Sequence, residues 1–542
     1  MRKHSVFAAI VHGCLAGSLM LAPCLAQNHP PVSLLDEFRP IGGGGNNLIN
    51  PGLDALPGNA QLSLAPLTFA PGPNNGLVSG PNPRTISNLI AGGTSSNGTD
   101  AETTDPTASA WLYVFGQFVD HDLDLESTPA NATAIDITVP AGDPVFNEGT
   151  SIAVTRAARS AVTNTVINTV AGYLDLSQLY GSTAAIASSL RNADGTLASS
   201  GEGQELPIAN GVFITGDPRV MENPELSAVT TLFMREHNYW VGTLRALHPE
   251  WSGDQLYEMA RAITTAEYQN IVYTEYLPVL VGNAVGPYQG YDPRVNAQVT
   301  QEFSAAAFRV GHSQVSDTQE GLDNNGQVTF TESLAQAFFN TAAVDEANGI
   351  DPLLRSIGVD FAQATDVYTV AVLRNLLFAP LVGGDIDQVD LIAIDIQRER
   401  DVGLGTLNQT RQAIGLAPYS SFAQLTSDSA LQNNLETVYG NVNNVDLFIG
   451  GLAENHARGA DVGPTFQAII ARQFQALRAG DRFFWQNQHF DRATAQMIRS
   501  TTLGAIIMRN TDTTSVQQNV FLAAPAGHIK ARLPARRDSH GH

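Results

Sequence analysis

The chain has 542 residues, of which 52 are acidic and 29 are basic, and its formal net charge is -23 at pH 7. A chain this acidic repels phosphate backbones and anionic lipids, so its charge argues against a nucleic-acid partner. Hydrophobic residues make up 43% of the chain and charged residues only 15%. This composition supports a large buried core and argues against long charged tails or coiled coils.

The first 26 residues predict a secretory signal peptide. Arg2 and Lys3 precede an apolar stretch over 6–20, and a small residue at Cys24 and another at Ala26 form a cleavage pattern. Both cysteines of the chain lie in this segment, so the mature protein has no disulfide and no thiolate ligand for a metal. A lipid anchor on Cys24 is the less favoured alternative. Because no later apolar run reaches the roughly 18 residues of a membrane span, we expect a secreted protein, periplasmic or extracellular.

The rest of the chain divides by composition into three parts. Residues 27–105 are rich in Pro, Gly, Asn and Ser and predict an irregular arm, residues 106–530 predict one large domain, and residues 531–542 predict a basic flexible tail. Strand-like alternation is scarce, so the predicted fold class is mainly α. Apolar spacing predicts helices over 108–121, 223–247, 253–281, 301–312, 363–377, 387–400, 463–479 and 490–508.

One predicted helix ends in an imidazole flanked by carboxylates. Gln117 and His121 are four residues apart and share a helix face, whereas Asp120 and Asp122 point to either side. The pattern alone fits a surface ion cluster, a metal site or, less often, a catalytic histidine.

Several distant segments limit these alternatives when they are taken together. They are GQFVDHD at 116–122, YLDLSQLYGS at 173–182, GDPRVMENPEL at 216–226, LFMREHN at 232–238, FRVGH at 308–312, DIQRERD at 395–401, GGLAE at 450–454 and GDRFFW at 480–485. In this order they resemble the motifs of the animal-type haem peroxidases, the peroxidase-cyclooxygenase superfamily. The resemblance covers roughly residues 36–505. It implies a single-domain helical haem peroxidase fold with an irregular N-terminal arm and little β structure, and haem b as the cofactor.

The resemblance places the proximal iron ligand at His312. Haem iron requires one strong axial ligand and an open position for peroxide. The residue that should accept the second imidazole proton is Asp395, where many relatives carry Asn. A carboxylate accepts that proton more strongly and would stabilise oxidised iron. In the alternative, Asp395 is neutral or engaged by Arg398, which matches a residue that contacts a haem propionate.

On the distal side, the resemblance implies that three residues act on peroxide. His121 would serve as general base and then as general acid, and Arg219 would stabilise the negative charge on the departing oxygen. Gln117, one turn from His121, would order the pocket water.

Two further carboxylates match positions that can form ester bonds to haem methyl groups. These are Asp120 and Glu222. Asn223 stands where the most strongly halide-oxidising relative has a Met that bonds a haem vinyl group. We therefore expect no sulfonium link and weak oxidation of chloride.

The resemblance also implies a calcium site built from hard oxygen ligands. Asp122, Asp175 and Ser177 match its side-chain ligands, and Tyr173 matches a carbonyl ligand. Ala171 occupies the position of a Thr that normally supplies both a hydroxyl and a carbonyl, so one side-chain ligand is missing. Two more motifs are assigned no chemistry. We expect residues 235–238 to form a buried polar brace and residues 323–326 to form a turn.

The function that these expectations favour is a secreted haem peroxidase. It would reduce hydrogen peroxide and oxidise small electron donors or (pseudo)halides through a ferryl intermediate. A second hypothesis is a haem fatty-acid dioxygenase, but that chemistry uses a Tyr three residues before the proximal histidine, where this chain has Arg309. A third is a non-catalytic, calcium-stabilised binding or adhesion protein, and a fourth is a non-haem metal site of His121, Asp122 and His312. The sequence leaves the oligomeric state and the physiological donor open.

Overall fold

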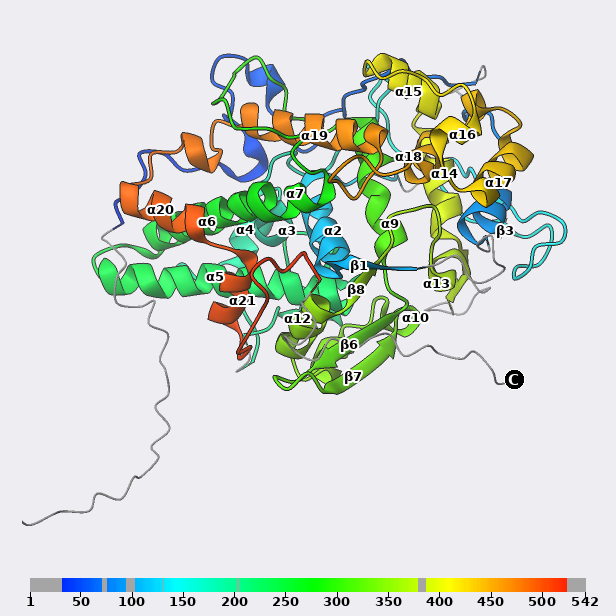
Figure 1. Cartoon of the computed structure of the whole chain (residues 1–542). Coiled ribbons are helices and arrows are strands. Elements are labelled where there is room, and N and C mark those ends of the chain that lie inside the picture. Colours follow the sequence, from blue (N-terminus) through cyan, green and yellow to red (C-terminus); the bar gives the residue numbers. More distant parts are fainter. Residues whose placement is uncertain are drawn as a thin grey trace, which may run out of the picture.

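The computed structural model describes residues 32–70, 76–93, 103–129, 131–201, 204–378 and 387–523 (Figure 1). The predicted signal peptide and the predicted basic tail lie outside these residues. Helices dominate the described chain and its strands are short, so the predicted mainly α class is confirmed. No described helix combines the length and the apolar character needed to cross a lipid bilayer.

The α-helices run as follows: α1 (Pro83–Ile86), α2 (Trp111–Leu123), α3 (Ser177–Tyr180), α4 (Ala184–Leu190), α5 (Pro224–Leu247), α6 (Gly253–Ile271), α7 (Leu277–Leu280), α8 (Gln301–Ser304), α9 (Gly311–Gln314), α10 (Leu334–Ala337), α11 (Ala342–Glu346), α12 (Ile350–Val359), α13 (Ala371–Arg374), α14 (Leu391–Asp401), α15 (Leu407–Ala413), α16 (Phe422–Leu425), α17 (Ser429–Tyr439), α18 (Leu447–Ala453), α19 (Pro464–Ala479), α20 (Arg492–Ser500) and α21 (Leu503–Asn510). Short 3-10 or π segments that bear on the site are η4 (Pro218–Met221), η5 (Val272–Tyr276) and η6 (Ala307–Val310).

The described strands form five antiparallel pairs: β1 (Thr104–Ser109) with β8 (Phe361–Gln363), β2 (Ile137–Thr138) with β3 (Ser151–Ile152), β4 (Ile208–Ala209) with β5 (Val212–Phe213), β6 (Thr318–Leu322) with β7 (Val328–Ser333), and β9 (Leu376–Phe378) with β10 (Asp387–Val389). The β6–β7 hairpin turns at the predicted 323–326 segment. There the Asp323 carboxylate accepts hydrogen bonds from the backbone of Asn325 and Gln327, which confirms the turn.

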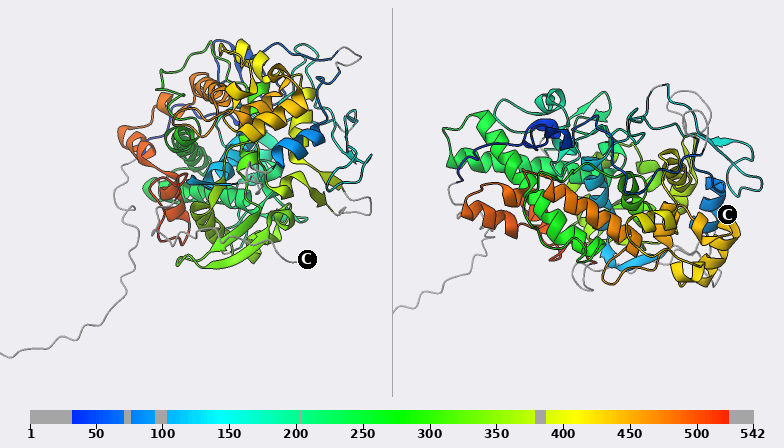
Figure 2. Two further views of the ribbon diagram at one scale, coloured as in Figure 1. Left: turned by 45° about the vertical axis from the view of Figure 1, so that its right-hand side comes forward. Right: turned by 90° about the horizontal axis from the view of Figure 1, so that it is seen from above.

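Helix α2 lies at the centre of the molecule and contacts α3, α5 and α9 (Figure 1). Its apolar residues Trp111, Phe115 and Phe118 are fully buried, and the Phe118 ring stacks on Phe233 of α5 with 5.1 Å between ring centroids. Helix α6 packs along α5 after a short connection (Figure 2). This packing buries most of α2 and fixes the direction in which its C-terminal residues point.

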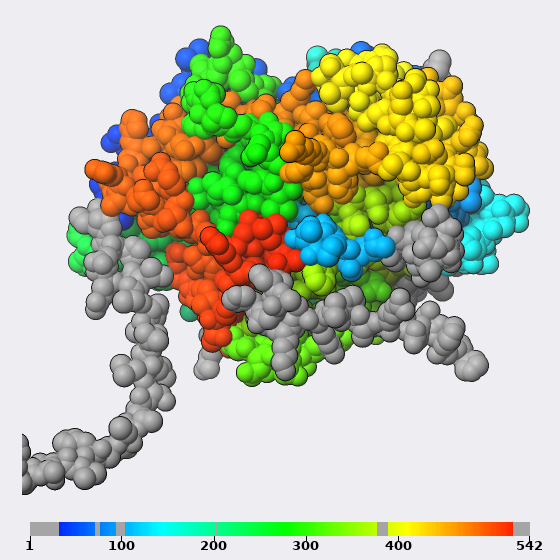
Figure 3. Space-filling model, in the orientation of Figure 1, coloured from blue at the N-terminus to red at the C-terminus, as the bar shows by residue number. Residues whose placement is uncertain are grey.

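Segments from distant parts of the sequence close around this core. Ala108 forms a β-bridge with Leu522, so the end of β1 lies beside the last described residues (Figure 3). In the N-terminal arm, Arg39 forms a buried ion pair with Asp481 at 2.5 Å, and Asn46 donates to the same carboxylate at 2.7 Å. The arm is therefore fixed to the helical body by buried polar contacts.

Three predicted helices differ from the structure. The helix over 363–377 is wrong: the segment joins β8 to β9 with only α13 between them, since its β-branched residues disfavour a helix. The helix predicted to start at 387 begins after β10, where the Asp390 side chain caps α14 by accepting from Ala393 at 3.0 Å. The helix over 490–508 breaks into α20 and α21 because Thr502 caps a new helix through its hydroxyl.

The remaining predicted helices lie where expected, although two are segmented. The segment 253–281 comprises α6, the π-helical η5 and α7, and the segment 301–312 comprises α8, η6 and the first turn of α9. Helices α1, α3, α4, α10, α11, α12, α15, α16, α17 and α18 were not predicted.

Candidate active site

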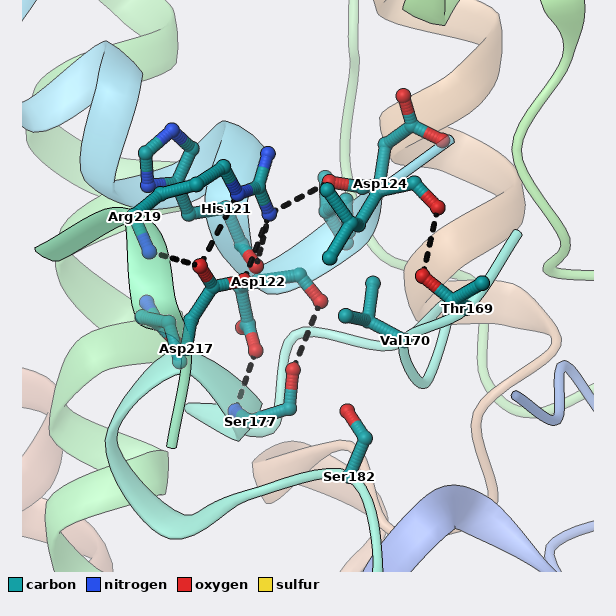
Figure 4. Close-up of polar contacts among 12 residues, drawn as sticks. His121, Asp122, Asp124, Thr169, Val170, Ser177, Ser182, Asp217 and Arg219 are labelled. Atoms are coloured by element: carbon teal, nitrogen blue, oxygen red, sulfur yellow. Dashed lines mark hydrogen bonds and ion pairs between the residues drawn. The ribbon is translucent and has the colours of Figure 1, made fainter. Parts of the chain in front are cut away.

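The end of α2 presents two functional side chains in opposite directions (Figure 4). Asp122 points toward the backbone turn at Ser177, whereas the His121 ring lies on the other side. His121 is only 5% exposed, and burial, together with the nearby positive charge of Arg219, lowers its pKa well below the ordinary value. The imidazole is therefore neutral at pH 7 and able to accept a proton.

Arg219 lies in η4 and is held against the end of α2. Its Nη2 donates to the Asp124 carbonyl at 2.8 Å and to the Asp217 carboxylate at 2.7 Å, and its Nε donates to Asp217 at 3.0 Å. The same Nη2 also lies 3.4 Å from the His121 carbonyl (Figure 4). Asp217 therefore orients the guanidinium beside the end of α2.

Gln117 joins α2 to the start of α5. Its Nε2 donates to Glu222 Oε2 at 2.9 Å, and its Oε1 accepts from the Asn223 amide at 2.9 Å. His121 Nε2 lies 3.7 Å from the same Glu222 oxygen. Burial raises the pKa of Glu222 to about 7. The structure thus brings Glu222 next to Gln117 and His121, which precede it by about a hundred residues in the sequence.

Asp120 lies near the end of α2, next to His121 in the sequence. Burial raises its pKa, while the positive charges of Arg219, Arg309 and His312 act in the opposite direction. Groups of both the predicted distal side and the predicted proximal side are therefore close enough to Asp120 to shift its pKa.

His312, at the start of α9, hydrogen-bonds through Nδ1 to Asp395 Oδ2 at 2.7 Å. Asp395 is fully buried in α14 and also accepts from Arg309 Nη1 at 2.7 Å. Burial alone would raise the pKa of Asp395, but His312 and Arg309 stabilise its anion and the net shift is downward. Asp395 is therefore ionised. The alternative in which Arg398 engages it is wrong.

Arg398 instead pairs with Glu126 at 3.0 Å and with Asp401 at 2.8 Å. Arg309 also approaches Glu126, at 3.8 Å. The two arginines thus flank one carboxylate near the proximal histidine. Their planar cations are suited to carboxylate groups such as haem propionates.

The predicted calcium ligands converge on the other side of α2. The Asp122 carboxylate accepts from the backbone amides of Asp175 and Leu176, both at 3.0 Å, and of Ser177 at 2.5 Å. Ser177 Oγ donates to the Asp122 carbonyl at 3.1 Å. Leu176 adopts a positive φ of 59° within this turn, which shows how tightly the loop is folded around the carboxylate.

The donor set at this turn fits a hard cation in part. Asp175 Oδ1 is buried without a hydrogen-bond partner among the described residues, and burial raises the pKa of Asp175 to about 6. The Tyr173 hydroxyl accepts from the arm residue Ala55, so only its carbonyl can face a cation. Ala171 offers no side-chain oxygen. In the described parts of the chain no group of three or more His, Cys, Asp or Glu side chains is arranged to hold a metal.

The proximal side fits haem by the chemistry of its donors. The Nδ1 of His312 is engaged by a carboxylate, and its Nε2 forms no hydrogen bond to any described residue. A histidine whose second nitrogen is anchored in this way is the usual protein ligand of haem iron. His312 would hold the iron, and Arg309 and Arg398 could receive its propionates.

Four residues near these groups were missed by the sequence analysis. Asp217 and Glu126 orient the arginines, and burial raises the pKa of Asp124 to about 8. All three are acids within or beside the family motifs, a signal that was available. Phe339 had no such signal in the sequence. It is 53% exposed and has a φ of 57°, and its backbone N–H donates to the Glu222 carbonyl at 3.4 Å.

The 235–238 segment is a polar brace, as predicted. Glu236 and His237 are fully buried. Glu236 accepts from Arg509 at 2.6 Å, and the two His237 nitrogens pair with the Tyr180 hydroxyl and the Gly195 carbonyl, each at 3.0 Å. With both nitrogens occupied inside the protein, His237 is not a metal ligand.

Comparison with known proteins identifies the family of this site. The family model described as animal haem peroxidase matches residues 38–521. The chain belongs to the animal haem peroxidase family. Peroxinectin A of Dictyostelium discoideum is 33% identical to this peroxidase over 90% of the chain and 96% of its own length. The solved structure of peroxidase A from Dictyostelium discoideum matches with a TM-score of 0.81 and 30% identity, over 90% of this chain and 99% of that one.

Related proteins with another activity share the fold alone. The solved structure of the fatty acid alpha-dioxygenase of Oryza sativa matches with a TM-score of 0.75 but only 18% identity, over 90% of this chain and 87% of that one. The family and the peroxidases at 30% identity or more make this protein a haem-dependent peroxidase, an oxidoreductase.

Proposed function

We propose that this peroxidase reduces hydrogen peroxide at the site around His121 and oxidises small electron donors or (pseudo)halides. The observation that carries the proposal is a neutral, buried His121 that shares its surroundings with Arg219, on a helix packed against the one that bears His312. Haem held by His312 would supply the electrons that split the O–O bond. The other tasks fall to side chains of the chain itself.

Peroxide must lose a proton from one oxygen and regain it on the other. His121, neutral at pH 7, accepts the first proton and returns it to the departing oxygen. Arg219 keeps its charge at every accessible pH and stabilises the negative charge that develops on that oxygen. Gln117, fixed by Glu222 and Asn223, orients a water or the peroxide beside His121.

Asp395 sets how strongly the imidazole proton of His312 is held. An ionised carboxylate at 2.7 Å draws the imidazole proton more strongly than an amide would, which favours the oxidised states of a bound iron. Arg309 also donates a hydrogen bond to Asp395, and its positive charge reduces the pull of the carboxylate on the imidazole proton. Arg309 also stands where the dioxygenase hypothesis requires a tyrosine, so fatty-acid oxygenation is not favoured.

The proposal extends to the haem linkage, the metal and the location of the protein. Asp120 and Glu222 form the ester bonds to haem, calcium binds at Asp122, Asp175 and Ser177 with the carbonyls of Ala171 and Tyr173, and the N-terminal 26 residues direct secretion. Because Asn223 replaces a Met, bromide, iodide or thiocyanate is oxidised in preference to chloride. Phe339, exposed beside Glu222, offers an aromatic surface to a small organic donor.

The rate of reaction with peroxide tests the proposal. His121→Ala should bind haem but react about a hundred- to ten-thousand-fold more slowly with hydrogen peroxide, the usual contribution of a placed acid-base group. Arg219→Ala should also bind haem and react more slowly than the wild type with hydrogen peroxide. His489→Ala, a change of an exposed histidine, is the matched control and should react at the wild-type rate. A wild-type rate in His121→Ala would remove that residue from the reaction.

A further inference from the structure

Arginine supplies nearly all of the positive charge of this protein. The 29 basic residues of the sequence comprise 27 arginines and two lysines, which are Lys3 and Lys530. Both lysines lie outside the described residues, and residues 4–529 contain no side-chain primary amine. Lysine is among the commonest residues of soluble proteins. Its absence over a stretch of this length is a property of the surface that the peroxide site does not explain.

The contacts of the exposed arginines do not require a guanidinium. Arg458 and Arg492 are exposed and form no hydrogen bond or ion pair with any described residue. Arg245 pairs with Asp194 at 3.3 Å, with 45% of the arginine side chain and 54% of the aspartate side chain exposed. A planar guanidinium is needed where it binds a carboxylate through two parallel bonds or stacks on a ring. None of these three arginines does so with a described residue, so an ammonium would serve their contacts equally well.

A guanidinium and an amine differ most in their reactivity toward oxidants. The lysine ammonium can lose its proton, and the free amine is a nucleophile that hypohalous acids convert to an N-halogen derivative. The guanidinium remains protonated in proteins, and its delocalised electrons make it a far poorer nucleophile. An arginine surface therefore carries positive charge without offering amines to an electrophilic oxidant.

Most other side chains that such oxidants attack are also withdrawn from the surface. The described residues include no cysteine, and none of the 4 tryptophans and 13 tyrosines is exposed. Of the five described methionines only Met508 is exposed, at 41%. His456 and His489 are exposed as well. The exposed groups of this reactivity among the described residues are thus one thioether and two imidazoles.

We propose that this lysine-free surface protects the protein from an amine-reactive oxidant that it produces itself, namely hypobromous acid. The inference rests on the proposed peroxidase function, in which bromide is one of the donors. Hypothiocyanous acid attacks thiols rather than amines, and phenoxyl radicals do not attack protonated amines. The lysine-free surface therefore fits protection from a halogenating product better than protection from the products of the other donors.

The chemistry needs no reagent beyond the proposed substrates. One bromide gives two electrons to one hydrogen peroxide, and with one proton the products are one hypobromous acid and one water. A lysine amine would take the bromine of hypobromous acid in exchange for a proton, which leaves a bromamine and water. A methionine thioether takes the oxygen instead, which leaves a sulfoxide, bromide and a proton.

Lysines placed on the surface test the protection in the haem-loaded protein. One variant combines Arg245→Lys, Arg458→Lys and Arg492→Lys, which keeps every charge. During turnover with bromide it should acquire bromine on the new amines and complete at least about twofold fewer turnovers before half of its activity is lost, because bromamines pass bromine to aromatic rings and form cross-links. The wild type should mainly gain one oxygen on Met508, measured by peptide mass spectrometry.

Two controls separate the reactivity of the amines from their charge. Guanidination of the lysine variant with O-methylisourea converts each amine to a guanidinium and should restore the wild-type lifetime. A variant that combines Arg245→Gln, Arg458→Gln and Arg492→Gln loses the charges without gaining amines and should also last as long as the wild type. A glutamine variant as short-lived as the lysine variant would overturn the inference, because the loss of arginine would then explain both results.

Hypobromous acid added to the haem-loaded protein without peroxide gives a readout that is independent of turnover. The lysine variant should form cross-linked dimers on a denaturing gel at a dose that leaves the wild type as single chains. Equal cross-linking of the two proteins, or equal lifetimes during turnover, would overturn the protective role of the missing lysines.

The outcomes separate the protection from the peroxidase function. A wild type that consumes peroxide but delivers no hypobromous acid to a phenol red trap would overturn the inference and leave the peroxidase standing. A haem-loaded wild type that consumes no peroxide refutes the peroxidase itself, and the inference with it.

Discussion

The Asp395 carboxylate should be energetically coupled to Arg309 in the folded protein. Asp395 is fully buried, Arg309 has 20% of its side chain exposed, and 2.7 Å separates the paired atoms. In Asp395→Asn the amide can still accept from His312, but it no longer balances the charge of Arg309. Removing one partner of a buried ion pair costs about 3–5 kcal/mol, because the other charge is left uncompensated in the core.

Two contacts reduce this cost for Arg309. Its Nε still donates to the Ser304 carbonyl at 2.9 Å, and its Nη2 lies 3.8 Å from Glu126 Oε1. We therefore expect Asp395→Asn to lower the free energy of unfolding by about 3 kcal/mol, which is on the order of a hundredfold in the ratio of folded to unfolded protein. Urea unfolding of the haem-free protein, followed by circular dichroism, measures this change.

A double-mutant cycle isolates the pair itself. Arg309→Gln should destabilise by a similar amount, and the double variant should lose less than the sum, with a coupling energy of about 1.5–3 kcal/mol. Arg294→Gln is the control for the substitution type, because Arg294 pairs with Asp292 on the open surface and should show no measurable change. A coupling energy below about 0.5 kcal/mol would refute the reasoning that Asp395 is held ionised between His312 and Arg309.

The remaining predictions concern the distal carboxylates and calcium. After brief exposure to peroxide, haem should resist extraction by acidified organic solvent, Asp120→Val and Glu222→Gln should each release part of it, and the double variant should release all. Mass spectrometry that finds only unmodified haem would contradict the ester bonds. Chelation of calcium should lower both the melting temperature and the haem absorbance of the wild type, and Asp122→Ala should reproduce this effect without a chelator. A chelator that changes neither quantity would rule out a structural calcium at this turn. Bromide should be oxidised faster than chloride in a halide assay, and the opposite order would refute the inference drawn from Asn223.

The parts of the fold that were predictable from the sequence are the long amphipathic helices. The start of helix α5 is indicated by Asn223, which caps the helix by accepting from Leu226 at 2.8 Å, and by Pro224 at its first position. Short segments gave no comparable signal. Helix α13 has only four residues between two strands, and its position is set by tertiary contacts that periodicity does not record.

The site was predictable in composition but not in all of its pairings. The resemblance predicted Gln117 and His121 as distal residues and Glu222, separately, as a carboxylate at the haem edge, and the structure places Gln117 and His121 beside the same oxygen of Glu222. The His312 partner of Asp395 was predicted, but its arginine partner was not, because Arg309 and Arg398 carry the same charge and differ only in direction. That direction is fixed by η6 and α14, whose relative placement depends on the whole core.

The measurement that tests the account most directly is a haem titration of the purified chain. Wild-type protein should bind one haem and develop a Soret band that saturates at a one-to-one ratio. His312→Ala should lose this band or hold haem only loosely, whereas His489→Ala should titrate like the wild type. A His312→Ala protein that binds haem as tightly as the wild type and keeps its full turnover of peroxide would contradict the assignment of His312 as the iron ligand.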